Sequence, residues 1–318
     1  DRYILSNIIA NQKVHEKYGG VVPELASRAH QKNIIPVVDT AIKEAGIKKE
    51  DISAISFTQG PGLLGSLLVG SSFAKSFALG LDIPLIAVNH MKGHIMAHFI
   101  RNQEEENKQP NFPFLCLTVS GGHTQIVLVK SVTEMIVIGE TLDDAAGEAF
   151  DKSAKILGLP YPGGPLIDKY AKRGDKDKFT FGRHKVGKYD FSYSGIKTSI
   201  LRVVEKEVER NPNFIKENLE DLCASIQHTI VEILIKKITK ASSELKINEI
   251  AIAGGVSANS YLRTRLTELQ EKQGKNVFIP KFEYCTDNAA MIAITGYYQF
   301  LEKDFSNQSV TPNYRLKL

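Results

Sequence analysis

The segment that decides the fold reads Ile83-Pro84-Leu85-Ile86-Ala87-Val88-Asn89-His90-Met91-Lys92-Gly93-His94. Its first half is a short apolar run, which predicts a buried strand, and its second half opens a helix that continues over 95–100. On that helix His90 and His94 are four residues apart, so both imidazoles lie on one face, one turn apart. Two neutral imidazoles in this arrangement can bind one divalent metal ion.

The histidine pair differs from the signature of zinc proteases. That signature needs a glutamate directly after the first histidine as general base, and Met91 occupies this position here. A protease is therefore disfavoured. Taken alone, the pair also fits two ordinary helix histidines, so the metal interpretation depends on the rest of the chain.

Strands and helices alternate on the N-terminal side of this segment. The sequence predicts a helix over 26–45, a strand over 52–57 and, after a Gly/Pro turn, a helix of small residues over 63–79. The chain opens inside another strand-like run, 4–10, from which we expect a further strand and loop upstream of it. The alternation predicts α/β layers around a mostly parallel inner sheet.

A second cycle of elements begins after the charged and amide-rich stretch 103–109, which is the predicted domain boundary. Two strands, 114–120 and 124–129, are joined by adjacent glycines and form a β-hairpin. The other predicted elements are strands at 135–138 and 250–253 and helices over 144–157, from residue 219 onward, over 260–270 and over 288–301. The repeated order suggests two related lobes on either side of a cleft, as in the actin-like ATPase fold.

Three glycine turns are available to a nucleotide. Gly254-Gly255 joins a strand to a helix, so the backbone can approach a ligand closely and the helix N-terminus favours an anion. The others are Ser120-Gly121-Gly122 and Gly163-Gly164. The Gly-x-Gly-x-x-Gly spacing of dinucleotide-binding proteins is missing. Asp287 precedes the final helix, where it is either the N-cap residue or a carboxylate that points into the cleft.

The segment around 170–198 is basic and contains aromatic residues. Its members are Lys172, Arg173, Lys176, Lys178, Arg183, Lys185 and Lys188, interleaved with Phe179, Phe181 and Tyr189. This composition suits unpaired RNA, where cations meet phosphates and rings stack on exposed bases. Asp175 and Asp177 dilute the charge, so a solvated insertion is the alternative.

The composition is ordinary for a soluble globular protein. Cys116, Cys223 and Cys285 are widely spaced, without the pairing expected of a metal or redox motif, which favours a reduced, cytoplasmic compartment. We find no uninterrupted apolar stretch long enough to span a bilayer, so no membrane partner is expected. The net charge of +4 is modest, and a nucleic-acid partner would need a local basic patch.

Together these motifs resemble, over nearly the whole chain, the family of universal tRNA threonylcarbamoyladenosine transferase subunits, once described as glycoproteases. The matching stretches are KYGGVVPE (17–24), QGPG (59–62), the histidine motif, VSGGHT (119–124), DDAAGEAFDK (143–152), YPGGP (161–165), FSYSGIKT (191–198), GGVSAN (254–259) and TDN (286–288). The wording of 143–152 is similar to that of the bacterial and organellar branch.

The resemblance implies an actin-like ATPase (ASKHA) fold, α/β in class, with two related lobes around a nucleotide and metal cleft. The first lobe would comprise 1–110, completed by about 297–318, and the second 111–296, with a basic insertion at about 170–198. By the same resemblance His90, His94 and Asp287 are the metal ligands. The implied contacts with the nucleotide and threonylcarbamoyl group are Thr118, Val119, Ser120, Gly121, Gly122, Asp151, Gly164, Asp168 and Asn259. No residue is assigned as the base for the amine proton.

The implied activity is transfer of threonylcarbamoyl from threonylcarbamoyl-AMP to N6 of the adenosine next to the anticodon, in tRNAs that read codons beginning with A. AMP is released. The implied cofactors are one divalent metal ion (Fe2+, Zn2+ or Mg2+) and an adenine nucleotide, which is threonylcarbamoyl-AMP, ATP, ADP or AMP. The implied partners are tRNA, a smaller inactive subunit of the same fold, a P-loop ATPase and the synthase that makes the donor.

Two other functions remain open at this stage. A nucleotide-binding scaffold subunit of the same fold has no need of a metal site, so the three implied ligands argue against it. A sugar-kinase-like phosphotransferase would use an aspartate as base but would leave the histidine motif unexplained. The family begins with a strand and an acidic, Ser/Thr-containing loop near the phosphates, and this chain starts after them, so we expect activity to need that segment.

Overall fold

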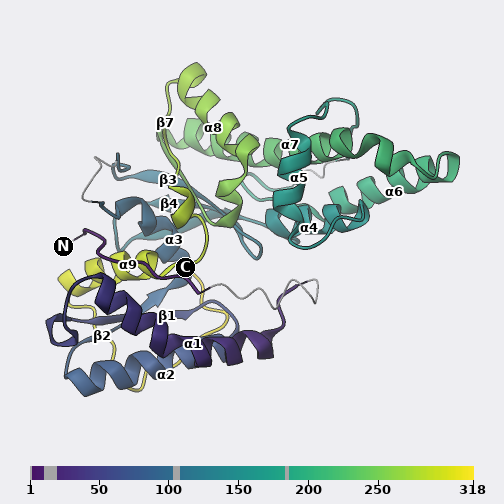
Figure 1. Ribbon diagram of the computed structural model, residues 1–318. Helices are drawn as coiled ribbons and strands as arrows, with labels where there is room; N and C mark the ends of the chain where they lie inside the picture. The colour runs from purple at the N-terminus through teal and green to yellow at the C-terminus, as the bar shows by residue number, and fades with distance from the viewer. Residues whose placement is uncertain (1, 11–19, 103–107, 183–185) are drawn as a thin grey trace. The chain divides into compact units, whose positions relative to one another are not determined.

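The computed structural model describes residues 2–10, 20–102, 108–182 and 186–318. The chain divides into two compact units (Figure 1): unit 1 is Asp1–Gln109 with Thr286–Leu318, and unit 2 is Pro110–Cys285. Unit 1 therefore resumes at Thr286, whereas the sequence analysis placed this return at about residue 297. Most of the boundary stretch predicted at 103–109 lies outside the described residues.

Unit 1 is built around two parallel strands, β1 (Ile55–Gly60) and β2 (Leu85–Asn89). Successive side chains of a strand point to opposite faces. Phe57 packs with Ala74 of helix α2 (Leu64–Leu81). Ser56 meets α9 (Ala289–Leu301), where a Cβ at Gly296 would collide with the serine hydroxyl. The two helices thus cover opposite faces of the strand pair (Figure 1).

Helix α1 (Pro23–Glu44) packs along α2 in Figure 1. By length and composition alone α2 could cross a membrane, which corrects the expectation that the chain has no such stretch. In this fold its small residues, such as Ala74 and Ala78, face the strands, because they allow close helix–sheet approach. Beside this buried face, the helix exposes the large apolar side chains Leu64, Leu68 and Leu79.

The strand predicted over 4–10 does not form. The backbone pairs here only briefly with the segment after α3 (His90–Met96) and the 3-10 turn η3 (Ala97–Phe99): Ile4 N donates to Arg101 O (3.0 Å), and Arg101 N donates to Arg2 O (2.9 Å). The prediction was wrong because apolar residues alone do not make a strand, which needs a partner of matching length. The strand predicted over 83–88 is confirmed as β2.

Unit 2 contains a five-stranded sheet in the order β5-β4-β3-β6-β7. The strands are β3 (Phe114–Val119), β4 (Thr124–Val129), β5 (Met135–Glu140), β6 (Glu249–Ala253) and β7 (Asn276–Phe278). The predicted hairpin is confirmed as the antiparallel pair β3–β4, and β4–β5 is antiparallel as well. Since β3–β6 and β6–β7 are parallel, the sheet of unit 2 is mixed; the mostly parallel sheet was predicted for the N-terminal half, where β1 and β2 are parallel.

Five helices in the described part of unit 2 share one apolar core with this sheet. They are α4 (Ala146–Ile156), α5 (Gly163–Ala171), α6 (Ser194–Arg210), α7 (Phe214–Leu245) and α8 (Ser260–Gln273). Helix α7 packs against α5, which crosses it in Figure 1, and its residues Leu222, Ile226 and Ile230 are fully buried. Each such side chain contributes about 1.5–3 kcal/mol relative to exposure. The sequence predicted this helix from residue 219, whereas the structure begins it at Phe214; Asn218, whose dihedral angles are non-helical, marks a kink between the first turn and the rest of the helix.

The basic segment between α5 and α6 is packed onto unit 2, with 183–185 outside the described residues. Phe181 and Tyr189 are buried, and Phe179 packs edge-on against Phe214 at 5.8 Å. The sequence predicted that these rings stack on unpaired RNA bases. In the structure they serve the protein core, because a ring that anchors an irregular segment gains more from burial than from exposure.

Candidate metal site and nucleotide-binding turns

Helix α3 presents the two histidines of the opening motif. Its N-terminus is capped by Asn89, whose Oδ1 accepts hydrogen bonds from the amides of Met91 (2.8 Å) and Lys92 (3.2 Å). At Gly93 a Cβ would lie 3.0 Å from Cδ1 of Ile292 in α9. The missing side chain therefore lets α3 approach α9 closely, which brings the histidine face to the start of that helix.

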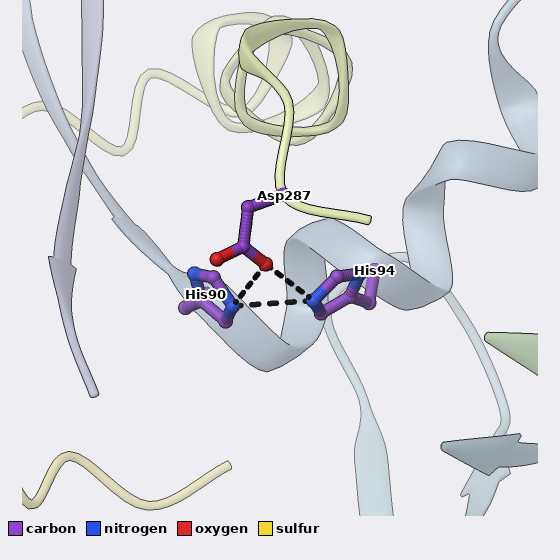
Figure 2. Close-up of side chains that lie close together, drawn as sticks. All are labelled: His90, His94 and Asp287. Carbon is purple, nitrogen blue, oxygen red and sulfur yellow. Dashed lines mark hydrogen bonds and ion pairs between the residues drawn. The ribbon is translucent and has the colours of Figure 1, made fainter. Parts of the chain in front are cut away.

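His90, His94 and Asp287 converge at this point, as Figure 2 shows. Oδ1 of Asp287 lies 3.2 Å from Nε2 of His90 and 3.3 Å from Nε2 of His94, and the two nitrogens are 3.1 Å apart. Ligand atoms at about 2.0–2.1 Å from a tetrahedral metal ion are roughly 3.3 Å from one another. The three atoms therefore have the spacing of ligands that share one ion.

The sequence left two alternatives for Asp287: the N-cap of the final helix, or a carboxylate that faces the site. Asn288, and not Asp287, is the N-cap residue of α9, since its Oδ1 accepts a hydrogen bond from the amide of Met291 (2.9 Å). The carboxylate of Asp287 is free to face the histidines. This geometry brings the three predicted metal ligands together, while their occupation by an ion stays a prediction.

The electrostatics of the three residues also suit a cation. The Asp287 side chain is 78% exposed, so desolvation raises the pKa of its carboxyl only weakly, and hydrogen bonds and charge from protonated His90 and His94 hold that pKa well below its usual range. A cation between the three residues would take the place of those protons. His94 is buried, and its Nδ1 has no hydrogen-bond partner among the described residues. A carboxylate and imidazole lone pairs are all acceptors, so only a proton or a cation among them satisfies all three. Two imidazoles and one carboxylate form a donor set that suits Zn2+ or Fe2+.

In unit 2, three chain segments converge on the turn between β3 and β4. Ser120 closes the turn: its amide donates to His123 O (2.8 Å), and its Oγ accepts from the His123 amide (3.1 Å). The amide of Gly147, at the start of α4, donates to Ser120 O (3.2 Å). Gly254, with φ +88°, lies so close to β3 that a Cβ would be 2.5 Å from Val119 O. Only glycine fits there.

Not all residues of this turn that were predicted to contact the nucleotide are exposed. Thr118 and Val119 are fully buried within the sheet, and the hydroxyl of Thr118 faces Gln125 O at 3.4 Å. Gly121 and Gly122 are exposed, and the space where their Cβ atoms would lie is open. Backbone amides at these two positions can therefore be approached by an anion.

The two predicted carboxylate contacts already hold helix N-termini. Oδ1 of Asp151 accepts from the amides of Gly163 (2.9 Å) and Gly164 (3.1 Å) at the start of α5. Oδ1 of Asp168 accepts from the amide (3.2 Å) and hydroxyl (2.7 Å) of Ser260 at the start of α8. In each case the described residues leave Oδ2 without a hydrogen bond. Each carboxylate can therefore cap a helix and still accept from a ligand.

Asn259 also has two partners. Its Oδ1 accepts from the amide of Leu262 (2.9 Å) as the N-cap of α8, and its Nδ2 donates to Oε1 of Gln227 in α7 (2.7 Å). Gln227 is not among the site residues predicted from the sequence. A signal was present, because an amide side chain follows directly after Ile226 within an apolar helical stretch.

Comparison with known proteins agrees with these features. The profile of the family described as "TsaD: tRNA N6-adenosine threonylcarbamoyltransferase" matches residues 3–294. This chain belongs to that family. It is 62% identical to the tRNA N6-adenosine threonylcarbamoyltransferase of Christiangramia forsetii, covering 99% of this chain and 92% of the relative. It is 58% identical to the protein of the same name from Riemerella anatipestifer, covering 100% and 92%.

Solved structures with similar folds are more distant in sequence. Full-length HypF, in a phosphate- and nucleotide-bound form, aligns with a TM-score of 0.59 at 15% identity, covering 83% of this chain and 41% of HypF. The HypF of T. kodakarensis aligns with a TM-score of 0.57 at 12% identity, covering 87% and 44%. At such identities the likeness establishes a shared α/β fold and nothing about the ligands of this TsaD-family chain.

Proposed function

We propose that this protein transfers the threonylcarbamoyl group of threonylcarbamoyl-AMP to N6 of the adenosine next to the anticodon in tRNAs that read codons beginning with A, releasing AMP. Its membership of the TsaD family supports the reaction class. The observation that carries catalytic competence is the convergence of His90, His94 and Asp287. A scaffold subunit of the same fold would have no use for these three side chains.

The proposal assigns the two units to the two lobes of an actin-like ATPase (ASKHA) fold. Unit 1 holds the candidate metal ligands, and unit 2 holds the turns at Ser120–Gly122, Gly163-Gly164 and Gly254–Asn259.

A bound divalent ion, Fe2+, Zn2+ or Mg2+, would act as a Lewis acid toward a phosphate or carbonyl oxygen of the donor. The amides of Gly121 and Gly122 would hold negative charge that develops on the donor as the amine attacks. Asp151 and Asp168 would accept hydrogen bonds from the nucleotide through Oδ2. Asn259 would donate one. The target adenosine lies in an unpaired loop, so exposing its amine costs little.

The test is transfer of labelled threonine to unmodified tRNA by the full-length protein, supplied with the donor synthase and partner subunits. His94→Ala should abolish transfer while the fold stays intact by circular dichroism. His30→Ala, which removes an imidazole from α1 outside the triad, should transfer as the wild type does. Undiminished transfer by His94→Ala would refute the metal role. No transfer by the wild type would favour the scaffold function instead.

We also propose the partners that this family implies. A smaller subunit of the same fold would dock on α2, whose exposed Leu64, Leu68 and Leu79 would otherwise contact water. A P-loop ATPase would complete the assembly, and a separate synthase would supply threonylcarbamoyl-AMP. Binding of tRNA would separate this function from a sugar-kinase-like phosphotransferase. A cytoplasmic location is consistent with three free, buried cysteines.

A further inference from the structure

Three polar pairs join α7 to the N-terminal half of α8. The pairs are Gln227 with Asn259, His228 with Tyr261, and Glu232 with Arg265, and their closest polar atoms are 2.7, 2.8 and 2.5 Å apart. The last two pairs are separated by one helical turn on both helices, so the pairs form a ladder between the helices. Only the first pair includes a residue that the proposed function places at the nucleotide.

The hydrogen bonds of this first pair fix the orientation of the Asn259 amide. Because Oδ1 of Asn259 accepts from the amide of Leu262 as the helix cap, the NH2 group must be the end that meets Gln227. Oε1 of Gln227 takes one of its two N–H groups. Among the residues that the structure describes, none accepts from the second N–H, which leaves it for an acceptor atom of a ligand.

Packing alone does not account for a glutamine at this position. Gln227 is 4% exposed and stands beside Ile226 and one turn from Ile230 and Val231, all fully buried or nearly so. An amide costs free energy in such surroundings unless it is hydrogen-bonded, and a leucine would fill a similar volume without that cost. The hydrogen bond to Asn259 satisfies Oε1 of Gln227 and gives the amide a use beyond packing.

We propose that Gln227 is a positioning residue for the adenine nucleotide. It holds the Asn259 amide so that its second N–H is presented to an acceptor atom of the nucleotide. The inference rests on the proposed function, in which Asn259 contacts the nucleotide. Next to Asn259, Ser260 holds Asp168 through Oδ1, which leaves Oδ2 as an acceptor. At the first turn of α8, Asn259 therefore offers one donor and Asp168 of α5 offers one acceptor, and each side chain is held by hydrogen bonds of its own.

Calorimetric titration of the full-length protein with AMP tests this role without requiring transfer. Gln227→Leu removes the acceptor for Asn259, and we expect AMP to bind about tenfold more weakly, because the Asn259 amide loses its fixed orientation. Gln227→Glu keeps an acceptor and should bind AMP within about threefold of the wild type. Asn259→Asp keeps the helix cap but removes the N–H donor, so it should weaken binding at least as much as Gln227→Leu.

Glu232→Gln is the matched control, because it alters another pair of the same ladder while Arg265 keeps Glu268 as a partner at 2.5 Å. It perturbs the contact between the two helices at a pair away from Asn259 and should leave AMP affinity unchanged. In transfer assays Gln227→Leu should raise KM for the donor more than it lowers kcat. Equal AMP affinity in Gln227→Leu and the wild type would overturn the proposal. Equal weakening by Glu232→Gln would also overturn it, because the ladder would then act only through stability.

These results separate the inference from the proposed function. A wild type that binds AMP but transfers no threonine would refute the transferase activity and leave the role of Gln227 standing. Unchanged AMP binding by Asn259→Asp would refute the inference at its first step, while threonine transfer by the wild type would still support the transferase.

Discussion

Replacement of Asp143 should loosen the start of α6, and the structure allows the size of the effect to be estimated. The carboxylate of Asp143 accepts four hydrogen bonds from the residues at the N-terminus of this helix. Its Oδ1 accepts from the amides of Tyr193 (2.7 Å) and Ser194 (3.3 Å), and its Oδ2 accepts from the hydroxyls of Ser192 (2.5 Å) and Ser194 (2.9 Å). Tyr193 is fully buried, so its amide has no access to water as a substitute.

Two substitutions at Asp143 divide this effect into parts. Asp143→Asn keeps Oδ1 for the two amides, and the serine hydroxyls can rotate to accept from the new NH2 group. It should cost about 1–2 kcal/mol, from the lost charge assistance and the lost interaction with the α6 dipole. Asp143→Ala leaves four donors without an acceptor, including the buried amide of Tyr193, and should cost about 3 kcal/mol or more.

The charge on Asp143 also makes this contribution dependent on pH. Burial would raise the pKa of the carboxyl, but the hydrogen bonds from Ser192, Tyr193 and Ser194 outweigh it and lower the pKa. A lowered carboxyl pKa contributes stability that is present above the unfolded pKa of about 3.9 and is lost as the pH falls through the folded pKa. The difference between wild type and Asp143→Asn should therefore be full at pH 7 and shrink below about pH 4.

Hydrogen exchange of the peptide that covers 191–200 measures this local opening directly. The peptide should exchange about tenfold faster in Asp143→Asn and about a hundredfold faster in Asp143→Ala, as the two free-energy costs require. Asp177→Asn is the control, since this exposed carboxylate pairs with Lys176 on the surface, and it should leave the peptide unchanged. Wild-type exchange in Asp143→Ala would refute the reasoning, because the four donors would then have other acceptors.

Three further predictions concern other parts of the chain. Gly254→Ala should destabilise unit 2 by about 2 kcal/mol or more in urea unfolding, because φ is +88° and a Cβ would lie 2.5 Å from Val119 O. Native protein should resist thiol reagents, since burial raises the pKa of Cys223 to about 12 and that of Cys116 still further; rapid labelling would contradict this. In the wild type, Zn2+ at a hundredfold excess over its Kd should raise the free energy of unfolding by about 2.7 kcal/mol and thereby raise the melting temperature. In His94→Ala, Zn2+ should leave the melting temperature unchanged.

Parts of the fold could be predicted from local sequence because their environment is uniform. Strand β3 is buried at every position, so its continuous apolar run identified it directly. The stretch 4–10 is also largely apolar, but the strand predicted there does not form. Whether a strand forms depends on a partner segment that local sequence does not contain. The antiparallel pair β3–β4 could be predicted from its short glycine turn, whereas the pairing of β6 with β3 joins strands far apart along the chain and has no local signal.

The candidate sites divide in the same way. The spacing of His90 and His94 is a local property of a helix, and the sequence was enough to place both on one face. Whether Asp287 caps a helix or faces them was decided by Asn288, which takes the capping position, and by the close packing that Gly93 allows. For the aromatic residues of 170–198 the sequence was not enough. It predicted that they stack on RNA bases, and only the tertiary packing revealed that Phe181 is buried.

The sequence by itself determined the family, the order of strands and helices, and the residue types available at each turn. Those are local properties, fixed by hydrophobic period, by glycine and by short motifs. The tertiary structure decided which side chains meet across the chain, as with Asp287 at the histidines and Gln227 at Asn259. Such contacts depend on how helices pack, and packing joins residues whose separation along the chain carries no signal of their proximity.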